Sequence, residues 1–280
     1  MSRTVIEADG KNLQYWRDIL KYRSLAATLA KRDITVRYKQ TFIGLGWSVI
    51  SPVVNMFLMS FVFGHVAKLS TDGQAPYSVM VYAGLIPWTL FSRNLQIASA
   101  TFLTSAGLMK KVYFPRIIVP LGTSLATFID TLISLGVLLV IMLTSFFTTG
   151  FVPSPRMLLL PLFALLPSVL GFSAGLFLSP LNIRFRDLNQ AIPFLINIGQ
   201  YVTPVAYSFT VACAAVPQKF RFIYSLNPAA GAINAFRWCI IPTNEFHWPS
   251  FLSALVFIAV FIPLGIRSFR KGERNFVDLV

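Results

Sequence analysis

Long apolar stretches, each nearly free of charged residues, recur along this chain of 280 residues. The sequence is 55% hydrophobic and only 12% charged, whereas a soluble domain carries about 25% charged residues. A water-soluble fold of this length could not cover so much apolar surface. Because about 20 apolar residues are enough for a helix to cross a bilayer, we predict an all-α integral membrane protein.

About six of these stretches are long enough to be membrane-spanning helices. They cover residues 42–67, 77–100, 117–147, 157–180, 189–209 and 249–268. The third exceeds the length that a span needs, so we expect it to tilt or to begin in the interface. No internal repeat or low-complexity segment divides the sequence. We therefore predict one domain over 1–280, made of an N-terminal segment (1–41), a membrane part (42–268) and a tail (269–280).

The distribution of Lys and Arg predicts that both ends of the chain are cytoplasmic. The net charge is +14, and most positive residues lie between the apolar stretches, which favours a topology signal over a nucleic-acid surface. With the N-terminus inside, the cytoplasmic segments hold eighteen Lys and Arg and the external loops hold five. The inverted arrangement violates the positive-inside rule. The first apolar stretch begins near Phe42, too late for a cleavable signal peptide, so we expect none.

Residues 1–41 are polar and basic, with nine Lys and Arg. Leu13, Trp16 and Leu20 recur among them at helical spacing, and tryptophan anchors well at a membrane interface. We favour a short amphipathic helix on the cytoplasmic surface, with its apolar face among the lipid headgroups. A disordered basic arm is the alternative.

Residues 222–242 are moderately apolar, but Pro228 and Gly231 interrupt them. Two short re-entrant half-helices that dip into the outer leaflet before the last span would fit this pattern. Such backbone survives only where protein or a water-filled cavity satisfies its polar groups. A surface helix and a seventh span are the alternatives, and the seventh span would place the basic tail outside.

Sequence motifs for enzymatic chemistry are missing. There is no GxSxG and no HExxH, and without GxxxxGK[ST] the chain has no P-loop of its own for ATP. His65 and His247 do not sit at ligand spacing with other residues, so we expect no metal site and no cofactor in this chain. Cys213 and Cys239 both fall on the predicted outer side of the membrane, where they could form a disulfide or remain free thiols.

Few charged residues fall inside the predicted spans, and Arg93 in the second and Asp130 in the third lie farthest from the span ends. Charge at membrane depth costs at least about 2.5–3.5 kcal/mol, so each should face a cavity, a partner charge or an interface. Pore lining, an ion pair between helices and snorkelling all remain open. In the fourth span Gly171 and Gly175 form a GxxxG pattern, which allows close helix packing.

Three separated stretches carry a family resemblance. They are Lys31 to Thr41 followed by Gly44, Gly46 and Trp47; Lys110 to Arg116; and Leu226-Asn227-Pro228 with Phe236-Arg237-Trp238. They resemble, in order and over nearly the whole chain, the polysaccharide-export permeases of the type-2 ABC transporter superfamily. The drug-exporting branch of that superfamily often carries large extracellular domains, for which this sequence has no room.

The resemblance implies an ATP-driven exporter of lipid-linked, O-antigen-type polysaccharide in a bacterial inner membrane. It implies a homodimer with two copies of a cytoplasmic ATP-binding subunit, which supplies the Mg-ATP, and contact with membrane lipid but not with nucleic acid. A permease for capsular polysaccharide or teichoic acid is the nearest alternative. A membrane-embedded glycosyl or acyl transferase is an alternative of another class, although no convincing catalytic group is present. A secondary transporter should show an inverted repeat, and we find none.

The resemblance also implies roles for residues at the two membrane surfaces. Coupling to the ATPase is expected at Lys110, Lys111, Val112, Tyr113, Phe114, Pro115 and Arg116. Basic residues attract a pyrophosphate-linked lipid, which should enter past Lys31, Arg32, Arg37 and Lys39, although the positive-inside bias explains any one of these equally well. A periplasmic gate is expected at Asn227, Pro228, Phe236, Arg237 and Trp238.

The resemblance further implies a channel lined largely by the first, second and fifth spans, and these spans carry some of the aromatic residues that make up 14% of the chain. Their faces can stack on sugar rings, although Phe is also compatible with lipid and Trp and Tyr form interfacial belts. The candidates are Phe57, Phe61, Tyr82, Trp88, Phe91, Phe194, Tyr201 and Tyr207.

Overall fold

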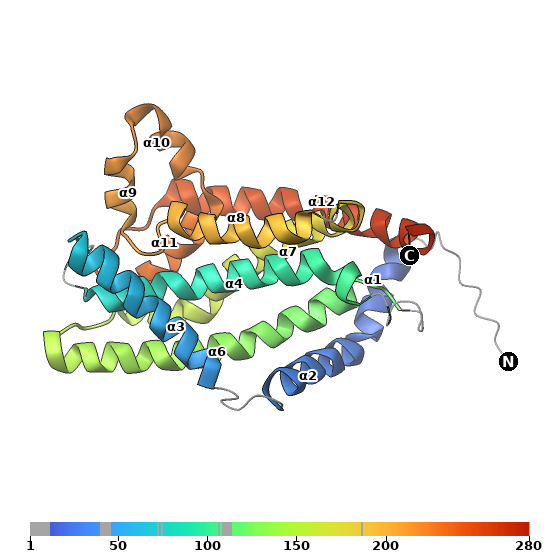
Figure 1. Cartoon of the computed structure of the whole chain (residues 1–280), viewed down its shortest axis with the longest axis horizontal. Helices are drawn as coiled ribbons and strands as arrows, with labels where there is room; N and C mark the ends of the chain where they lie inside the picture. Colours follow the sequence, from blue (N-terminus) through green and yellow to red (C-terminus); the bar gives the residue numbers. More distant parts are fainter. Residues whose placement is uncertain are drawn as a thin grey trace.

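The computed structural model describes residues 12–39, 46–71, 73, 75–105, 107, 114–185 and 187–279. These residues are largely helical and include no strand. The long helices lie side by side in an elongated bundle (Figure 1). We call the end that carries α1 and the close of α12 the terminal end, and the opposite end, where α9 and α10 project, the far end.

Six long elements run along the bundle in the described part of the chain. They are α3 (Gly46–Met59) with its π-helical continuation η1 (Ser60–Val66), α4 (Tyr77–Thr104), α6 (Ile118–Thr149), α7 (Leu160–Arg184), α8 (Leu188–Val202) and α12 (Trp248–Leu279). Four stretches are long and apolar enough to cross a bilayer: Gly46–Val66, Ile118–Thr149, Pro155–Arg184 and Trp248–Arg274. The prediction of an all-α membrane protein is confirmed, and α4 and α8 are the two elements that need a separate explanation.

Helix α4 is long but less apolar than a span that faces lipid. Most of its side chains are buried, because α6, α7, α8 and α11 all contact it. A helix that is covered by protein can carry polar groups at membrane depth. Helix α8 has 15 residues, fewer than the roughly 20 that cross a bilayer, and it ends at Val202 instead of continuing to 209 because the chain turns at Thr203 and Pro204.

Helices α4 and α7 pack closely through two glycines. A Cβ atom on Gly175 would lie 2.6 Å from the carbonyl oxygen of Leu95, and one on Gly171 would overlap that of Phe91. This is the close approach that the GxxxG pattern predicts. Since Phe91 and Leu95 face α7, the opposite side of α4 is turned toward α6.

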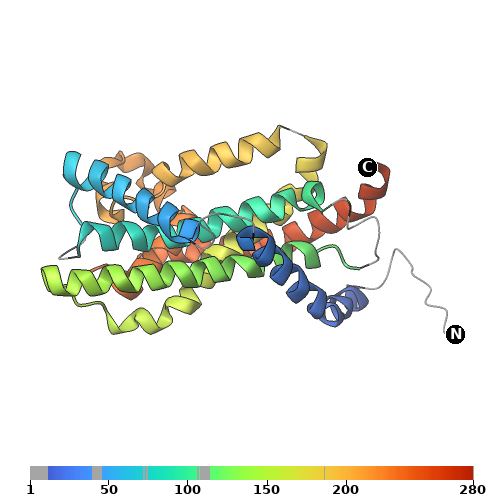
Figure 2. The ribbon, with the colours of Figure 1, turned by 60° about the horizontal axis from the view of Figure 1, so that its bottom comes forward.

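Two helices at the terminal end precede the first span. α1 (Asn12–Lys21) exposes Trp16 and Leu20, as expected for an amphipathic helix, and packs Tyr15 and Ile19 inward. α2 (Arg23–Lys39) lies against α6. Figure 1 shows α3 crossing α4 and α6 obliquely, and Figure 2, with the bottom of the molecule turned forward, shows α2 passing in front of α6.

Short helices form the far end: η2 (Pro155–Leu159), α9 (Phe209–Ala215), α10 (Gln218–Ser225) and α11 (Pro228–Ile240). The break expected within residues 222–242 lies between α10 and α11. Asn227 caps α11 by accepting hydrogen bonds from the N–H groups of Ala229 and Ala230, at 3.0 and 3.3 Å. α11 is buried against α4, α7 and α12, whereas α10 has no buried residue. Cys213 in α9 and Cys239 in α11 are free thiols.

Candidate functional site

The segment expected to couple to an ATPase is described only at its end. Lys110, Lys111, Val112 and Tyr113 lie outside the described residues. Phe114 is buried in a hydrophobic cluster that also contains Phe102 of α4 and Phe269 of α12. Pro115 and Arg116 then lead into α6.

Arg116 is held by the end of α12. Its backbone N–H donates to Glu273 Oε1 at 3.0 Å, and its Nη1 donates to the Glu273 carbonyl oxygen at 2.9 Å. The Tyr15 hydroxyl of α1 donates to Glu273 Oε2 at 3.4 Å, and Arg270 lies 4.6 Å over the Tyr15 ring. Burial, together with the Glu273 charge, raises the pKa of Tyr15, so its hydroxyl stays a donor. Glu273 therefore joins α1, the start of α6 and α12.

The residues expected where a substrate enters lie on α2. Lys31 and Arg32 are exposed, whereas the side chains of Arg37 and Lys39 lie outside the described residues. Arg32 does not present an isolated positive charge. Its Nε and Nη2 both donate to Asp33 Oδ1, at 3.1 and 2.8 Å. It therefore offers a phosphate less charge than its sequence position suggested.

A cleft of about 390 Å³ opens beside Arg32, between α2, α4 and α6. Its lining combines seven polar or charged residues with three apolar ones: Arg32, Asp33, Gln96, Ile97, Ala100, Thr101, Thr104, Ser105, Val119 and Thr123. Of these residues the sequence indicated only Arg32, because the lining comes from three elements that are far apart in the chain.

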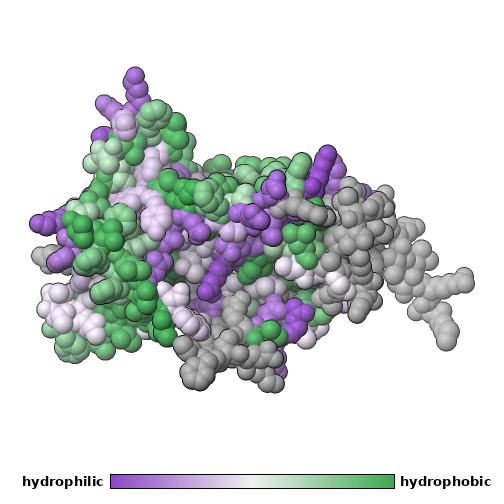
Figure 3. All heavy atoms as spheres, in the orientation of Figure 1, coloured by the Kyte–Doolittle hydropathy of each residue, from purple (hydrophilic) through white to green (hydrophobic). Residues whose placement is uncertain are grey.

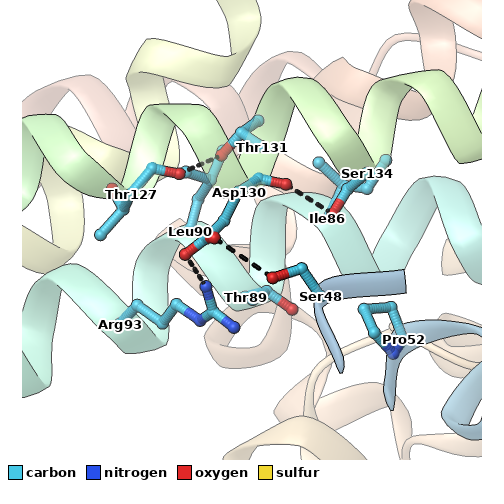
Figure 4. Close-up of a pocket in the computed structure, with 10 residues that line it drawn as sticks. All are labelled: Ser48, Pro52, Ile86, Thr89, Leu90, Arg93, Thr127, Asp130, Thr131 and Ser134. Atoms are coloured by element: carbon cyan, nitrogen blue, oxygen red, sulfur yellow. Dashed lines mark hydrogen bonds and ion pairs between the residues drawn. The ribbon is translucent and has the colours of Figure 1, made fainter. Parts of the chain in front are cut away.

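A second polar pocket lies farther along α4 and α6, where α3 covers them (Figure 4). Arg93 Nη1 donates to Asp130 Oδ2, and Ser48 of α3 donates to Asp130 Oδ1 at 3.4 Å. The Asp130 side chain is 8% exposed and that of Arg93 is 40% exposed. Of the readings that the sequence left open, the structure shows an ion pair between helices.

The predicted channel aromatics differ in exposure. Phe57 and Phe61 of the first span and Phe194 and Tyr201 of α8 are all more than half exposed. Tyr207 is half-buried and donates its hydroxyl to the Tyr201 and Val202 carbonyl oxygens, at 2.8 and 3.0 Å. These side chains are available to a channel or to lipid, with Tyr207 fixed against the end of α8.

Two of the α4 aromatics need correction. Tyr82 is 0% exposed and Trp88 is 5% exposed, so neither has surface to offer a channel in this structure. Phe91, partly buried, packs against Trp88 at 5.5 Å between ring centroids. Because the first half of α4 is apolar nearly all round, the sequence could not tell which of its faces is covered. On the face of the bundle that Figure 3 shows, hydrophilic residues lie across the middle, between more hydrophobic margins.

Two of the five expected gate residues lie in the protein interior, and the other three are partly buried. Phe236 and Arg237 of α11 are almost completely buried. Arg237 donates from Nε to Met80 O at 3.0 Å and to three carbonyl oxygens of the turn after α8, those of Pro204, Val205 and Tyr207, at 2.9, 2.5 and 2.9 Å. These carbonyls lie beyond the helix and have no intrahelical partner. Arg237 thus fastens α11 to α4 and to the end of α8.

Trp238, the last of the expected gate residues, is only partly buried. The Arg156 guanidinium lies 4.4 Å from the centre of its ring, and Phe163 and Phe246 pack at its edge. Among the described residues no group of three or more His, Cys, Asp or Glu side chains could hold a metal.

We predict that Arg237→Met lowers the free energy of unfolding by about 3 kcal/mol or more, because buried carbonyls lose their donors. Arg237→Lys should recover only part of the loss, since an ammonium group cannot reproduce the guanidinium fork. Thermal unfolding of the purified permease in detergent measures both. Arg156→Met, which removes one cation–π contact worth about 1 kcal/mol, is the matched control. Equal melting of Arg237→Met and this control would contradict the fastening role.

Comparison with known proteins agrees with this architecture. Residues 24–241 match the family described as ABC-2 type transporter. Two O-antigen export system permease proteins RfbA from Klebsiella pneumoniae are 28% and 27% identical over 271 residues, which is 96% of this chain and 97% of each relative. A third O-antigen export system permease protein RfbA, from Myxococcus xanthus, is 25% identical over 221 residues, which is 79% of this chain and 82% of that protein. Since the family match covers well over half of the sequence, this membrane protein belongs to the ABC-2 type transporter family.

Proposed function

We propose that the chain is the transmembrane subunit of an ATP-driven exporter that moves lipid-linked, O-antigen-type polysaccharide across a bacterial inner membrane. The observation that carries this proposal is the similarity, over nearly the full length of both chains, to permeases named for O-antigen export. The positive-inside distribution of Lys and Arg supports a cytoplasmic location for the terminal end.

We further propose that two copies of the chain enclose the channel. Met59 is the one residue of the first span, Gly46–Val66, that is buried within the described protomer. Helix α8 exposes a row of large apolar side chains that includes Phe194 and Tyr201. Residues 194 and 201 are seven positions apart and lie on one face of the helix. A second copy would cover part of this surface, and aromatic rings would give sugar chains a surface on which to slide.

The ATP-binding partner would contact the segment from Lys110 to Arg116. The structure supports this in one respect: the described end of the segment is tied through Glu273 to both α1 and α12. Motion imposed there would reach the last span directly. ATP hydrolysis, with its Mg²⁺, is assigned to the partner.

The double substitution Lys110→Glu with Lys111→Glu reverses the charge of the coupling segment. It should weaken capture of the ATPase subunit at least about tenfold, because the partner surface that faces two lysines is expected to be acidic and like charges across an interface cost several kcal/mol. This pair leaves the Arg116–Glu273 contact intact. Co-purification of the two subunits from membranes measures the effect. Lys219→Glu with Arg221→Glu on α10 makes the same charge change at the far end and should leave capture normal. Normal capture and normal export by the Lys110/Lys111 variant would count against the coupling segment.

Replacing Phe194→Ala with Tyr201→Ala should slow export severalfold and leave the oligomeric state unchanged, because both side chains are exposed and neither fills the protomer core. Surface polysaccharide measured over time, together with size-exclusion chromatography, checks this. Phe146→Ala with Phe147→Ala removes two exposed rings from α6 and serves as the control. Export at the wild-type rate would remove α8 from the channel lining.

A further inference from the structure

We infer that a polar track between α4 and α6 binds the sugar rings of the substrate, as neutral polyhydroxy groups, starting at the cleft beside α2. The inference rests on the proposed function and adds to it the place and the chemistry of the first contact. It differs from the aromatic lining proposed above, which involves α3 and α8.

The cleft and the inner pocket are two sections of one pair of facing helix surfaces. Each helix contributes lining residues that are spaced three or four positions apart and therefore lie on a single face. On α4 these include Thr89, Arg93, Gln96, Ala100 and Thr104, and on α6 they include Thr123, Thr127, Asp130 and Ser134. Apolar side chains complete the lining: Ile86, Leu90, Ile97 and Val119. Helix α2 forms one side of the cleft at the terminal end. Helix α3 forms one side of the inner pocket with Ser48 and Pro52.

Several polar groups on this track have no partner among the described residues. The Gln96 amide and the hydroxyls of Thr89 and Thr123 make no hydrogen bond there, and Arg93 uses only Nη1, which leaves Nε and Nη2 available. Figure 4 shows the rest of the Arg93 guanidinium turned away from Asp130. Unpaired polar groups at membrane depth are costly unless water or a polar ligand satisfies them. The track is therefore built to meet a hydrogen-bonding occupant.

The charges on the track favour sugar over phosphate. Each section contains one Arg paired with one Asp: Arg32 with Asp33 in the cleft, and Arg93 with Asp130 in the inner pocket. A phosphate is bound best by uncompensated positive charge. A sugar ring presents hydroxyls that both donate and accept, so a guanidinium, a carboxylate, an amide and free hydroxyls can all serve it at once.

The sizes of the two sections indicate an order of binding. The cleft, at about 390 Å³, falls within the roughly 300–1,000 Å³ of typical ligand pockets. The inner pocket, at about 20 Å³, has room for about one water. The cleft is therefore open to a ligand, and the inner pocket is closed by α3. Since Met59 is the only described residue of α3 that is fully buried, α3 is the wall that can move to widen the inner section.

The test uses the complete transporter, permease with its ATPase subunit, in lipid nanodiscs. Saturation-transfer NMR would record binding of short oligosaccharides built from hexoses, 6-deoxyhexoses and N-acetylhexosamines, with inorganic pyrophosphate as a competitor. Gln96→Leu with Thr123→Val should weaken binding about tenfold, the loss of two hydrogen bonds. Gln218→Leu with Thr144→Val makes the same chemical changes away from the track and should bind as wild type. Thr123→Ser, which keeps the hydroxyl, should also retain binding.

Each result bears on one claim. Equal binding by the Gln96/Thr123 variant and its control would overturn the track, and displacement of the sugars by pyrophosphate would overturn the sugar assignment. Export in cells separates this from the proposed function. If the wild-type complex exports polysaccharide and the Gln96/Thr123 variant exports equally well, only the track fails. If the wild-type complex exports none, the proposed function fails.

Discussion

The absence of hydrogen-bonding partners in lipid is the constraint on which this structure depends. Helix α4 carries Arg93, Asn94 and Gln96, a group of side chains that a bilayer would not accept on a helix that faces lipid. The fold solves this by placing α4 inside the bundle, where Gly171 and Gly175 bring α7 against its backbone. The more apolar helices around it then face outward.

This arrangement leaves α4 with two functionally different sides. One is locked to α7, and the other faces α6 across the cleft and the Arg93–Asp130 pocket. At the far end the same helix accepts a hydrogen bond from Arg237 through the Met80 carbonyl. At the terminal end Phe102 of α4 joins Phe114 and Phe269 in one cluster. A single helix thus connects the cluster around Phe114, the cleft with the inner pocket, and the far-end turn.

The sequence predicted part of this reliably, for physical reasons. Uncharged stretches of sufficient length located the spans, and Gly171-xxx-Gly175 located the close helix contact. Arg93 and Asp130 were among the few charges expected within the spans, so their pairing was one of few options open. The faces of α4 could not be predicted, since aromatic residues such as Tyr82 and Trp88 suit a core, a channel and lipid alike. The contacts of Arg237 and Glu273 could not be predicted either, because their partners are far apart in sequence and form no local pattern.

We propose that this permease moves a lipid-linked polysaccharide when its partner hydrolyses ATP. Reconstitution of the permease and its ATPase into liposomes that contain the lipid-linked polymer provides the test. We expect the polymer to stimulate ATP hydrolysis and to become accessible to a glycosidase on the opposite side of the membrane only when ATP is present. If the rate of hydrolysis does not respond to the polymer and all of the polymer stays on its original side, the permease does not transport it.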